Sequence, residues 1–201
     1  MSGSSLKKDF TMKKIIAVTA VIATLAPAIA FAGPSLGLAY SDVGLSGHSG
    51  RPGISIGASS LYSNNVDASG SATFARGFYQ VHAKIGKRIP ASGVIVEPYV
   101  SMGFINANYS QRFQPSVSDF YGLAGADMYV PIGKRVSVEL GGGYGHTLMA
   151  FGGSSGAVYR GKAALNFGIA KRVFGDLQAT YLHVPGQSVT EYGAGISYHF
   201  S

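Results

Sequence analysis

The feature that most constrains the fold is a strict two-residue alternation near the end of the chain, in residues 190–200. This stretch reads T-E-Y-G-A-G-I-S-Y-H-F, so the large residues alternate with small or polar ones. Because successive side chains of a strand point to opposite faces, one face is aliphatic and aromatic and the other is small or polar. Large residues facing outward and small residues facing a confined space are typical of a barrel that crosses a membrane.

The composition supports the same fold class. Charged residues make up 12% of the 201 residues, against roughly 25% in soluble domains. The body of the chain contains no apolar run near the ~18–20 residues that a membrane helix needs. The absence of Cys excludes disulfides and thiolate metal sites. We therefore predict an all-β protein, an antiparallel transmembrane up-and-down β-barrel formed by a single domain.

Residues 12–32 have the organisation of a secretory signal peptide. Lys13 and Lys14 precede an apolar segment over residues 15–25, and Ala30-Phe31-Ala32 forms a small-residue cleavage site. We expect cleavage between Ala32 and Gly33. A membrane anchor is disfavoured because the apolar segment is short and is followed by Pro27. Residues 1–32 are thus an extension plus signal peptide, with Met1 and Met12 both open as the start, and residues 33–201 form the barrel domain.

Cleavage at this site would remove much of the basic charge. The lost residues include Lys7, Lys8, Lys13, Lys14 and Asp9, which lowers the formal charge from +7 to +4. A nucleic-acid partner is therefore not expected, because much of the basic charge of the chain belongs to the segment that is removed.

One tetrapeptide recurs between alternating segments. Residues 85–88 and 132–135 both read Ile-Gly-Lys-Arg, and residues 169–172 read Ile-Ala-Lys-Arg. We interpret these as three short turns at one end of the barrel, the periplasmic end, because membrane barrels have short periplasmic turns and longer extracellular loops. The Lys-Arg pairs either contact lipid headgroups or are simply hydrated turn residues.

The alternation predicts eight strands, with ten as the alternative. Residues 63–72 are expected to form the first loop, and residues 53–62 to close the barrel against the last strand. Residues 36–42 are left as an extra strand, a partial plug or an N-terminal arm, so the role of residues 33–52 stays open. The eight predicted strands are residues 53–62, 74–86, 94–104, 120–130, 136–144, 159–169, 177–181 and 190–200.

The candidate site lies inside the predicted barrel, where charged residues fall on the inward face of consecutive strands. Buried charges must be paired, so we predict a lumen ion-pair network, extended if Glu191 joins it. The network either fills the interior of a small barrel or lines a narrow polar path. Its predicted members are Arg76, His82, Lys84, Glu97, Asp127, Glu139, Arg160 and Lys162.

No catalytic, metal or cofactor site is predicted. His48 with Ser49 and His146 with Thr147 fall near the outer end, but the pattern places no acid beside them, and a Ser–His pair needs a third, orienting group. The five His are scattered without the spacing of metal ligands.

The last strand also resembles the C-terminal signal by which bacterial barrel proteins reach their assembly machinery, through Gly195, Tyr198 and Phe200. With the signal peptide and hairpin periodicity, the chain resembles the OmpA-like and OmpX/Ail-like outer-membrane barrels, and its glycine-rich hairpins resemble the YfaZ family. The resemblance implies a Gram-negative outer membrane and passage by periplasmic chaperones to the barrel assembly machinery. It also implies a monomer in contact with outer-membrane lipids and lipopolysaccharide.

Three functions are compatible with this pattern. The first is a non-enzymatic integral barrel that contributes to envelope integrity or surface interaction. The second is a narrow porin-like channel, which a lumen without a charged plug would favour. The third is a lipid-modifying enzyme, which a cluster of His, Ser and an acid at the outer rim would favour.

Overall fold

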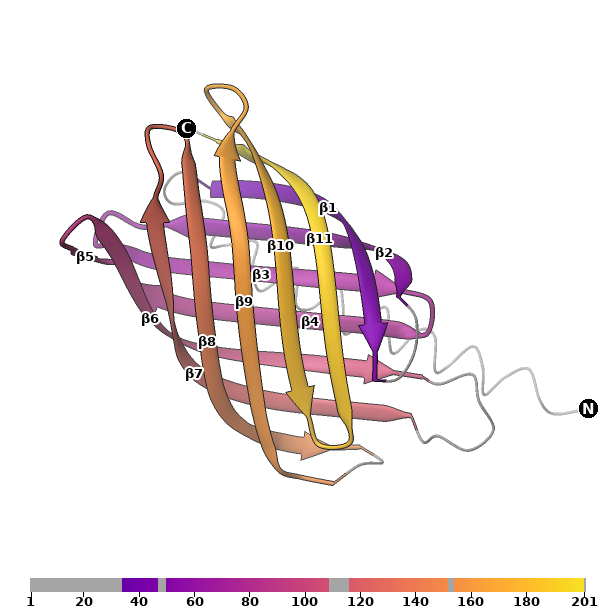
Figure 1. Ribbon diagram of the computed structural model, residues 1–201. Helices are drawn as coiled ribbons and strands as arrows, with labels where there is room; N and C mark the ends of the chain where they lie inside the picture. Colours follow the sequence, from indigo (N-terminus) through magenta and orange to yellow (C-terminus); the bar gives the residue numbers. More distant parts are fainter. Residues whose placement is uncertain (1–33, 47–49, 109–115, 152–153, 201) are drawn as a thin grey trace, which may run out of the picture.

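The computed structural model describes residues 34–46, 50–108, 116–151 and 154–200. The predicted cleavage site at Ala32 and Gly33 lies outside the described residues. The described chain is organised in strands, shown in Figure 1. They are β1 Pro34–Leu45, β2 Arg51–Leu61, β3 Val66–Ala75, β4 Phe78–Lys87, β5 Ile89–Ala91, β6 Val94–Ala107, β7 Val117–Pro131, β8 Val136–Ala150, β9 Ala157–Gly168, β10 Val173–Val184 and β11 Gln187–His199.

Ten of these strands close into an antiparallel barrel, a count that refers to the described residues. Consecutive strands of the wall pair with one another, β4 pairs with β6 rather than with the short β5, and β1 pairs with β11 to complete the ring. Figure 1 shows β1 and β11 side by side although they come from opposite ends of the chain. The short β5 adds only to the edge of β6 at one rim. The predicted antiparallel β-barrel is confirmed, with the alternative number of ten strands rather than eight.

One additional strand is β3, in the segment that we expected to be the first loop. Residues 63–72 resemble a loop in the sequence because the alternate positions that would face outward hold only small residues, Ala68, Gly70 and Ala72. They nevertheless alternate with Asp67, Ser69 and Ser71, and β3 pairs along its length with β2 and β4. Small side chains weaken the sequence signal of a strand but do not prevent its backbone from joining a ladder.

The other additional strand is β1, which contains residues 36–42 and closes the barrel. Leu36 lies opposite Tyr198 of β11, and Tyr40 lies opposite Ala194. The prediction that residues 53–62 close the barrel is therefore wrong, because β2 pairs with β1 and β3 instead. Residues 33–52 form no separate arm or plug where they are described, since they belong to β1, its connection and the start of β2.

Arg76 does not face the lumen, contrary to its predicted place in the ion-pair network. The chain reverses at Arg76 and Gly77 in a two-residue connection between β3 and β4. Gly77 has a φ of 70°, in the left-handed region that glycine adopts without steric cost. The predicted single strand over residues 74–86 is thus the end of β3, a tight hairpin and β4, with Arg76 exposed at the tip.

The two ends of the barrel differ, and we call them the turn end and the loop end. The turn end carries Pro34, Phe200 and the connections at residues 62–65, 88–93, 132–135 and 169–172. All three copies of the repeated tetrapeptide therefore lie at this end. The loop end carries the connections at residues 76–77 and 185–186, together with the ends of β1, β6 and β8 and the starts of β2, β7 and β9.

Large apolar side chains cover the outside of the wall. Leu38 is 55% exposed, Tyr192 is 60% exposed, and comparable residues occur on nearly every strand. A soluble protein buries such residues, and a continuous exposed apolar surface marks contact with a membrane or a partner. In the described residues, no helix is long and apolar enough to cross a membrane.

Glycines on the inner face make room for tyrosine rings that lie across neighbouring strands. A Cβ atom added at Gly125 or Gly143 would lie 2.7 Å from the hydroxyl oxygen of Tyr99. A Cβ atom at Gly103 would meet the ring of Tyr121 in the same way. The glycine-rich segment in β8 therefore allows close packing inside the barrel.

This packing predicts that Gly143→Ala destabilises the barrel by about 1–3 kcal/mol, the range for overpacking a filled interior. Tyr99→Phe removes the hydroxyl that the new methyl group would meet, so it should reduce the loss. Gly161→Ala is the matched control, because nothing lies within 4 Å of a Cβ atom there. The measurement is the free energy of unfolding in denaturant with lipid vesicles present. Equal effects of the two glycine substitutions would contradict the packing argument.

Candidate functional site: a polar lumen beneath an apolar plug

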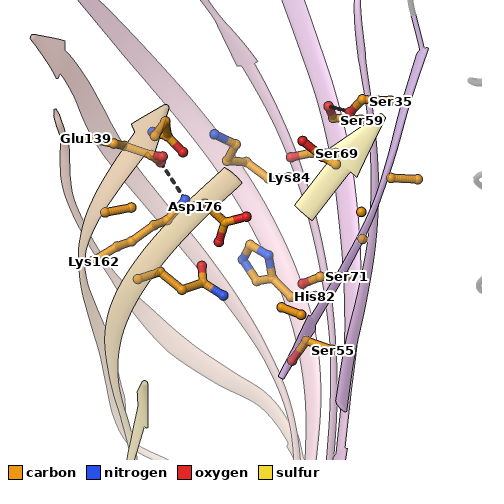
Figure 2. A pocket seen from close by; sticks show the side chains of 18 of the residues that line it. Ser35, Ser55, Ser59, Ser69, Ser71, His82, Lys84, Glu139, Lys162 and Asp176 are labelled. Atoms are coloured by element: carbon orange, nitrogen blue, oxygen red, sulfur yellow. Dashed lines mark hydrogen bonds and ion pairs between the residues drawn. The ribbon is translucent and has the colours of Figure 1, made fainter. Parts of the chain in front are cut away.

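A polar cavity of about 550 Å³ occupies the lumen and extends to the turn end. Its lining includes Ser35 near the start of β1 and His199 at the end of β11, and deeper residues such as Gln80 and Glu191. Figure 2 shows serines of β1, β2 and β3 along one wall, with Glu139 and Lys162 on the other side. One wall is therefore rich in hydroxyl groups and the other is charged.

The first charged group is centred on Glu97 of β6, whose side chain is fully buried. Lys84 Nζ lies 2.5 Å from Glu97 Oε1 and 2.8 Å from Asp127 Oδ2. Arg88 bonds to the other oxygen of Glu97 at 3.1 Å and to Asp67 at 2.8 Å. Two cations and three carboxylates thus form one connected network, the arrangement that buried charges require.

The second charged group lies on β8 and β9. Lys162 Nζ donates to Glu139 Oε1 at 2.7 Å. Arg160 Nη1 lies 3.4 Å from His82 Nε2, which joins β9 to β4 across the lumen. Asp176 of β10 also lines the cavity, and Figure 2 shows it between this group and the serine wall.

The hydroxyl wall surrounds Glu191 of β11. Ser41, Ser55 and Thr73 donate to Glu191 Oε1 at 2.7, 2.9 and 3.3 Å. The hydroxyls of Ser41 and Ser55 also lie 2.6 Å apart, and those of Ser55 and Thr73 lie 2.8 Å apart. Several hydroxyl donors can stabilise a buried carboxylate without a cation.

An apolar cluster fills the lumen at the loop end, and we call it the plug. Its residues continue the inward-facing positions of the same strands, since Val43 follows Ser41 by two residues and Val189 precedes Glu191 by two. No plug residue lines the polar cavity. The plug consists of Val43, Leu45, Phe78, Ile105, Ala107, Val117, Tyr121, Leu123, Val158, Leu182, Val184 and Val189.

Tyr121 marks the boundary between the plug and the polar cavity. Its side chain is fully buried, and its hydroxyl accepts a hydrogen bond from Gln80 Nε2 at 2.9 Å. Gln80 lines the cavity, whereas Ile105 and Leu182 lie with Tyr121 among the apolar residues. The lumen is therefore polar on one side of this ring and mainly apolar on the other, where Asp119 and Gln187 are buried polar residues on the plug strands.

The structure brings most of the predicted network residues together, in two groups. Lys84, Glu97 and Asp127 form the first group, and Glu139, Lys162, Arg160 and His82 form the second. Arg76 lies apart from both. Sequence reasoning missed Arg88 and Asp67, because Arg88 lies in a repeated turn and Asp67 in the segment expected to be a loop.

The plug was also missed, although its residues continue the inward-facing series. The sequence does contain a signal for the plug: the inward-facing residues change from polar to apolar along each strand towards the loop end. That change is visible only once the hairpins are correctly placed.

A Ser–His contact occurs on the outer face of β10 and β11. His183 Nδ1 lies 2.9 Å from Ser188 Oγ, and Tyr181 donates a hydrogen bond to the same oxygen at 3.0 Å. The His183 ring stacks on Tyr159 at 4.5 Å. Among the described residues no carboxylate hydrogen-bonds to His183, so the pair lacks the orienting acid of a hydrolase.

Two other histidines were weighed as candidates in the sequence. His146 Nδ1 lies 2.9 Å from the carbonyl oxygen of Thr147, and His48 lies outside the described residues. In the described part of the chain, no group of three or more His, Cys, Asp or Glu could hold a metal ion.

The residues of the C-terminal signal lie on β11 and directly after it. Tyr198 and Phe200 are exposed on the outer face, with ring centroids 5.0 Å apart in an edge-on arrangement. Gly195 lies opposite Ala39 at the seam with β1. The last strand therefore presents its aromatic residues outward at the turn end.

No family model matches the chain, and no curated protein matches it. Solved structures with a similar fold are outer-membrane barrels. The translocator domain of the autotransporter NalP from Neisseria meningitidis is 10% identical, with 96% of this chain and 98% of that chain covered and a TM-score of 0.47. Ail, the attachment invasion locus protein of Yersinia pestis, is 17% identical, with 84% and 97% covered and a TM-score of 0.38. The NanC porin is 9% identical, with 81% and 98% covered and a TM-score of 0.49.

The charge network predicts that Glu97→Gln costs about 3 kcal/mol of stability, because it breaks the buried ion pairs that Glu97 makes with both Lys84 and Arg88, although each cation keeps a second carboxylate. Glu139→Gln is the comparison and should cost less, since the Lys162 side chain is 22% exposed and can hydrate. Lys84→Met added to Glu97→Gln should increase the loss, because it leaves the buried Asp127 carboxylate without its cation. The measurement is the free energy of unfolding in denaturant. A smaller loss for Glu97→Gln than for Glu139→Gln would contradict this ranking.

Proposed function

We propose that the protein is a non-enzymatic, non-conducting integral barrel of a Gram-negative outer membrane, which contributes to envelope integrity or surface interaction. The single observation that carries the proposal is the distribution of side chains across the wall. Large apolar residues cover the outside, while ion pairs and hydroxyls lie in the lumen. A soluble domain has the opposite distribution, with its large apolar residues inside. A bilayer stabilises the distribution found here.

The dimensions and ends of the barrel support a membrane location. The ten wall strands contain 10–15 residues, and a tilted membrane strand needs about 9–11. Both described chain ends lie with the short turns, so the turn end is proposed to face the periplasm and the loop end the cell exterior.

The plug supports a barrel without a through-path. Val43, Ile105, Val158 and Val184 are fully buried inside the wall, at the loop end. An ion crossing this layer would lose most of its hydration among aliphatic side chains and would meet few polar groups, such as the buried Asp119 and Gln187, which costs several kcal/mol. The polar cavity is then a blind pocket that opens towards the turn end and is closed by the plug.

A narrow channel is the second candidate. The observation that favours it is the cavity itself, because about 550 Å³ of polar space already extends from the turn end to the level of the plug. If the plug rearranged, the ion pairs would line a continuous polar path. The two functions therefore differ in one property, which is whether the plug stays closed.

We predict that the wild-type protein is silent in planar bilayers and that Ile105→Ala combined with Leu182→Ala and Tyr121→Ala opens small conductance steps. Glu97→Ala should stay silent, because the charged network lies on the turn-end side of the plug. The matched control is Ile54→Ala combined with Leu140→Ala and Tyr192→Ala, which truncates exposed outward residues of the same types.

The measurement is single-channel conductance after insertion of each purified protein. Stable, ion-selective steps from the wild type would overturn the non-conducting proposal and place the channel first. Steps from the Glu97 variant alone would show that the charged network, and not the plug, closes the lumen.

A further inference from the structure

The repeated tetrapeptide places basic side chains around part of the turn end. Arg88 of the first copy turns into the lumen, where it pairs with Asp67 and Glu97. The remaining basic residues of the three copies are exposed, and we call them the basic rim: Lys87, Lys134, Arg135, Lys171 and Arg172. The proposed barrel function uses none of them.

The charge of the basic rim is not balanced by neighbouring exposed acids. None of the described Asp and Glu residues is exposed, and most line or enter the lumen. The lumen carboxylates are Asp67, Glu97, Asp127, Glu139, Asp176 and Glu191. The barrel thus keeps its negative charge inside and presents positive charge at the turn end, which attracts an anionic partner from outside.

Each copy of the tetrapeptide also begins with an exposed isoleucine. Ile85, Ile132 and Ile169 are 52–59% exposed; Ile85 is on the outer face of β4, and Ile132 and Ile169 directly follow β7 and β9. A Cβ atom added at the outward Gly175 would lie 3.2 Å from Ile169 and would also meet the ring of Phe167, so Ile169 lies on the outer apolar surface. Each lysine follows two residues after an isoleucine that belongs to this surface.

An apolar anchor followed by a basic group is the arrangement that suits the edge of a bilayer. The isoleucine lies in the hydrocarbon, while the longer basic side chain reaches the headgroup layer. The aromatic residues at the same rim fit this level, since Arg172 Nη1 lies 3.5 Å from the hydroxyl of Tyr198. A soluble acidic protein or polysaccharide would need the basic groups but not the exposed isoleucines.

We propose that the basic rim binds the phosphodiester headgroups of anionic phospholipids in the leaflet that surrounds the turn end. This inference rests on the proposed membrane location and adds a lipid preference to it. The three copies lie at the β4–β6, β7–β8 and β9–β10 connections, whereas the β2–β3 connection carries Asn64 and Asn65. The preference is therefore directed to one arc of the rim.

The test compares lipid retention by the full-length protein in membranes of phosphatidylcholine and phosphatidylglycerol in equal parts. After extraction, native mass spectrometry counts the lipids of each class that stay bound. The wild type should retain phosphatidylglycerol in excess. Lys134→Gln with Lys171→Gln should reduce this preference by about fivefold for each charge removed, and high salt should weaken it.

The matched control is Arg51→Gln with Arg76→Gln, which removes two charges at the loop end and should keep the preference. An equal loss in the control would overturn the assignment, because total charge and not the rim would then set the preference. A protein that inserts into phosphatidylcholine alone and shows no phosphatidylglycerol excess would overturn the lipid site but leave the proposed function intact. Failure to insert into either lipid would overturn both.

Discussion

The closed ladder of backbone hydrogen bonds is the constraint on which the rest of this structure depends. An open sheet would leave a row of unpaired N–H and C=O groups on each edge strand, at a cost of several kcal/mol per group in a lipid core. Here β1 meets β11 over its length and β4 meets β6, so no wall strand in the described chain ends the sheet. Closure also creates an inner and an outer face. The alternation along each strand then places one set of side chains in the lumen and the other set on the outside of the wall.

The inner face is packed in different ways at its two ends, by paired charges at one and by aliphatic side chains at the other. Towards the turn end, carboxylates and basic groups neutralise one another, and Glu97 links Lys84 to Arg88. Towards the loop end, aliphatic side chains around Tyr121 pack without polar partners. Between them, glycines leave room for Tyr99 and Tyr121 to lie across neighbouring strands. The barrel is thus polar and open on one side of its interior and mainly apolar and packed on the other.

Much of this arrangement could be predicted from local pattern, and the failures have physical causes. Inward positions such as Lys84, Glu97 and Glu139 follow from alternation alone, because the period of two is a property of the strand. β3 was missed because its outward residues are too small to give an apolar signal, and the Arg76–Gly77 hairpin was missed because it interrupts the alternation for only two residues. Arg88 was read as a turn residue because nothing local shows that its side chain enters the lumen.

The sequence by itself determined the fold class, the apolar outer face and the repeated basic turns, since each depends on residues close together in the chain. Only the tertiary structure decided which strand closes the barrel and which side chains meet across the lumen. Lys84 of β4 reaches Asp127 of β7 past the intervening β6, and Glu191 of β11 meets hydroxyls from β1, β2 and β3. These contacts depend on strand number, register and curvature, which are set by the pairing of all strands together and not by any one segment.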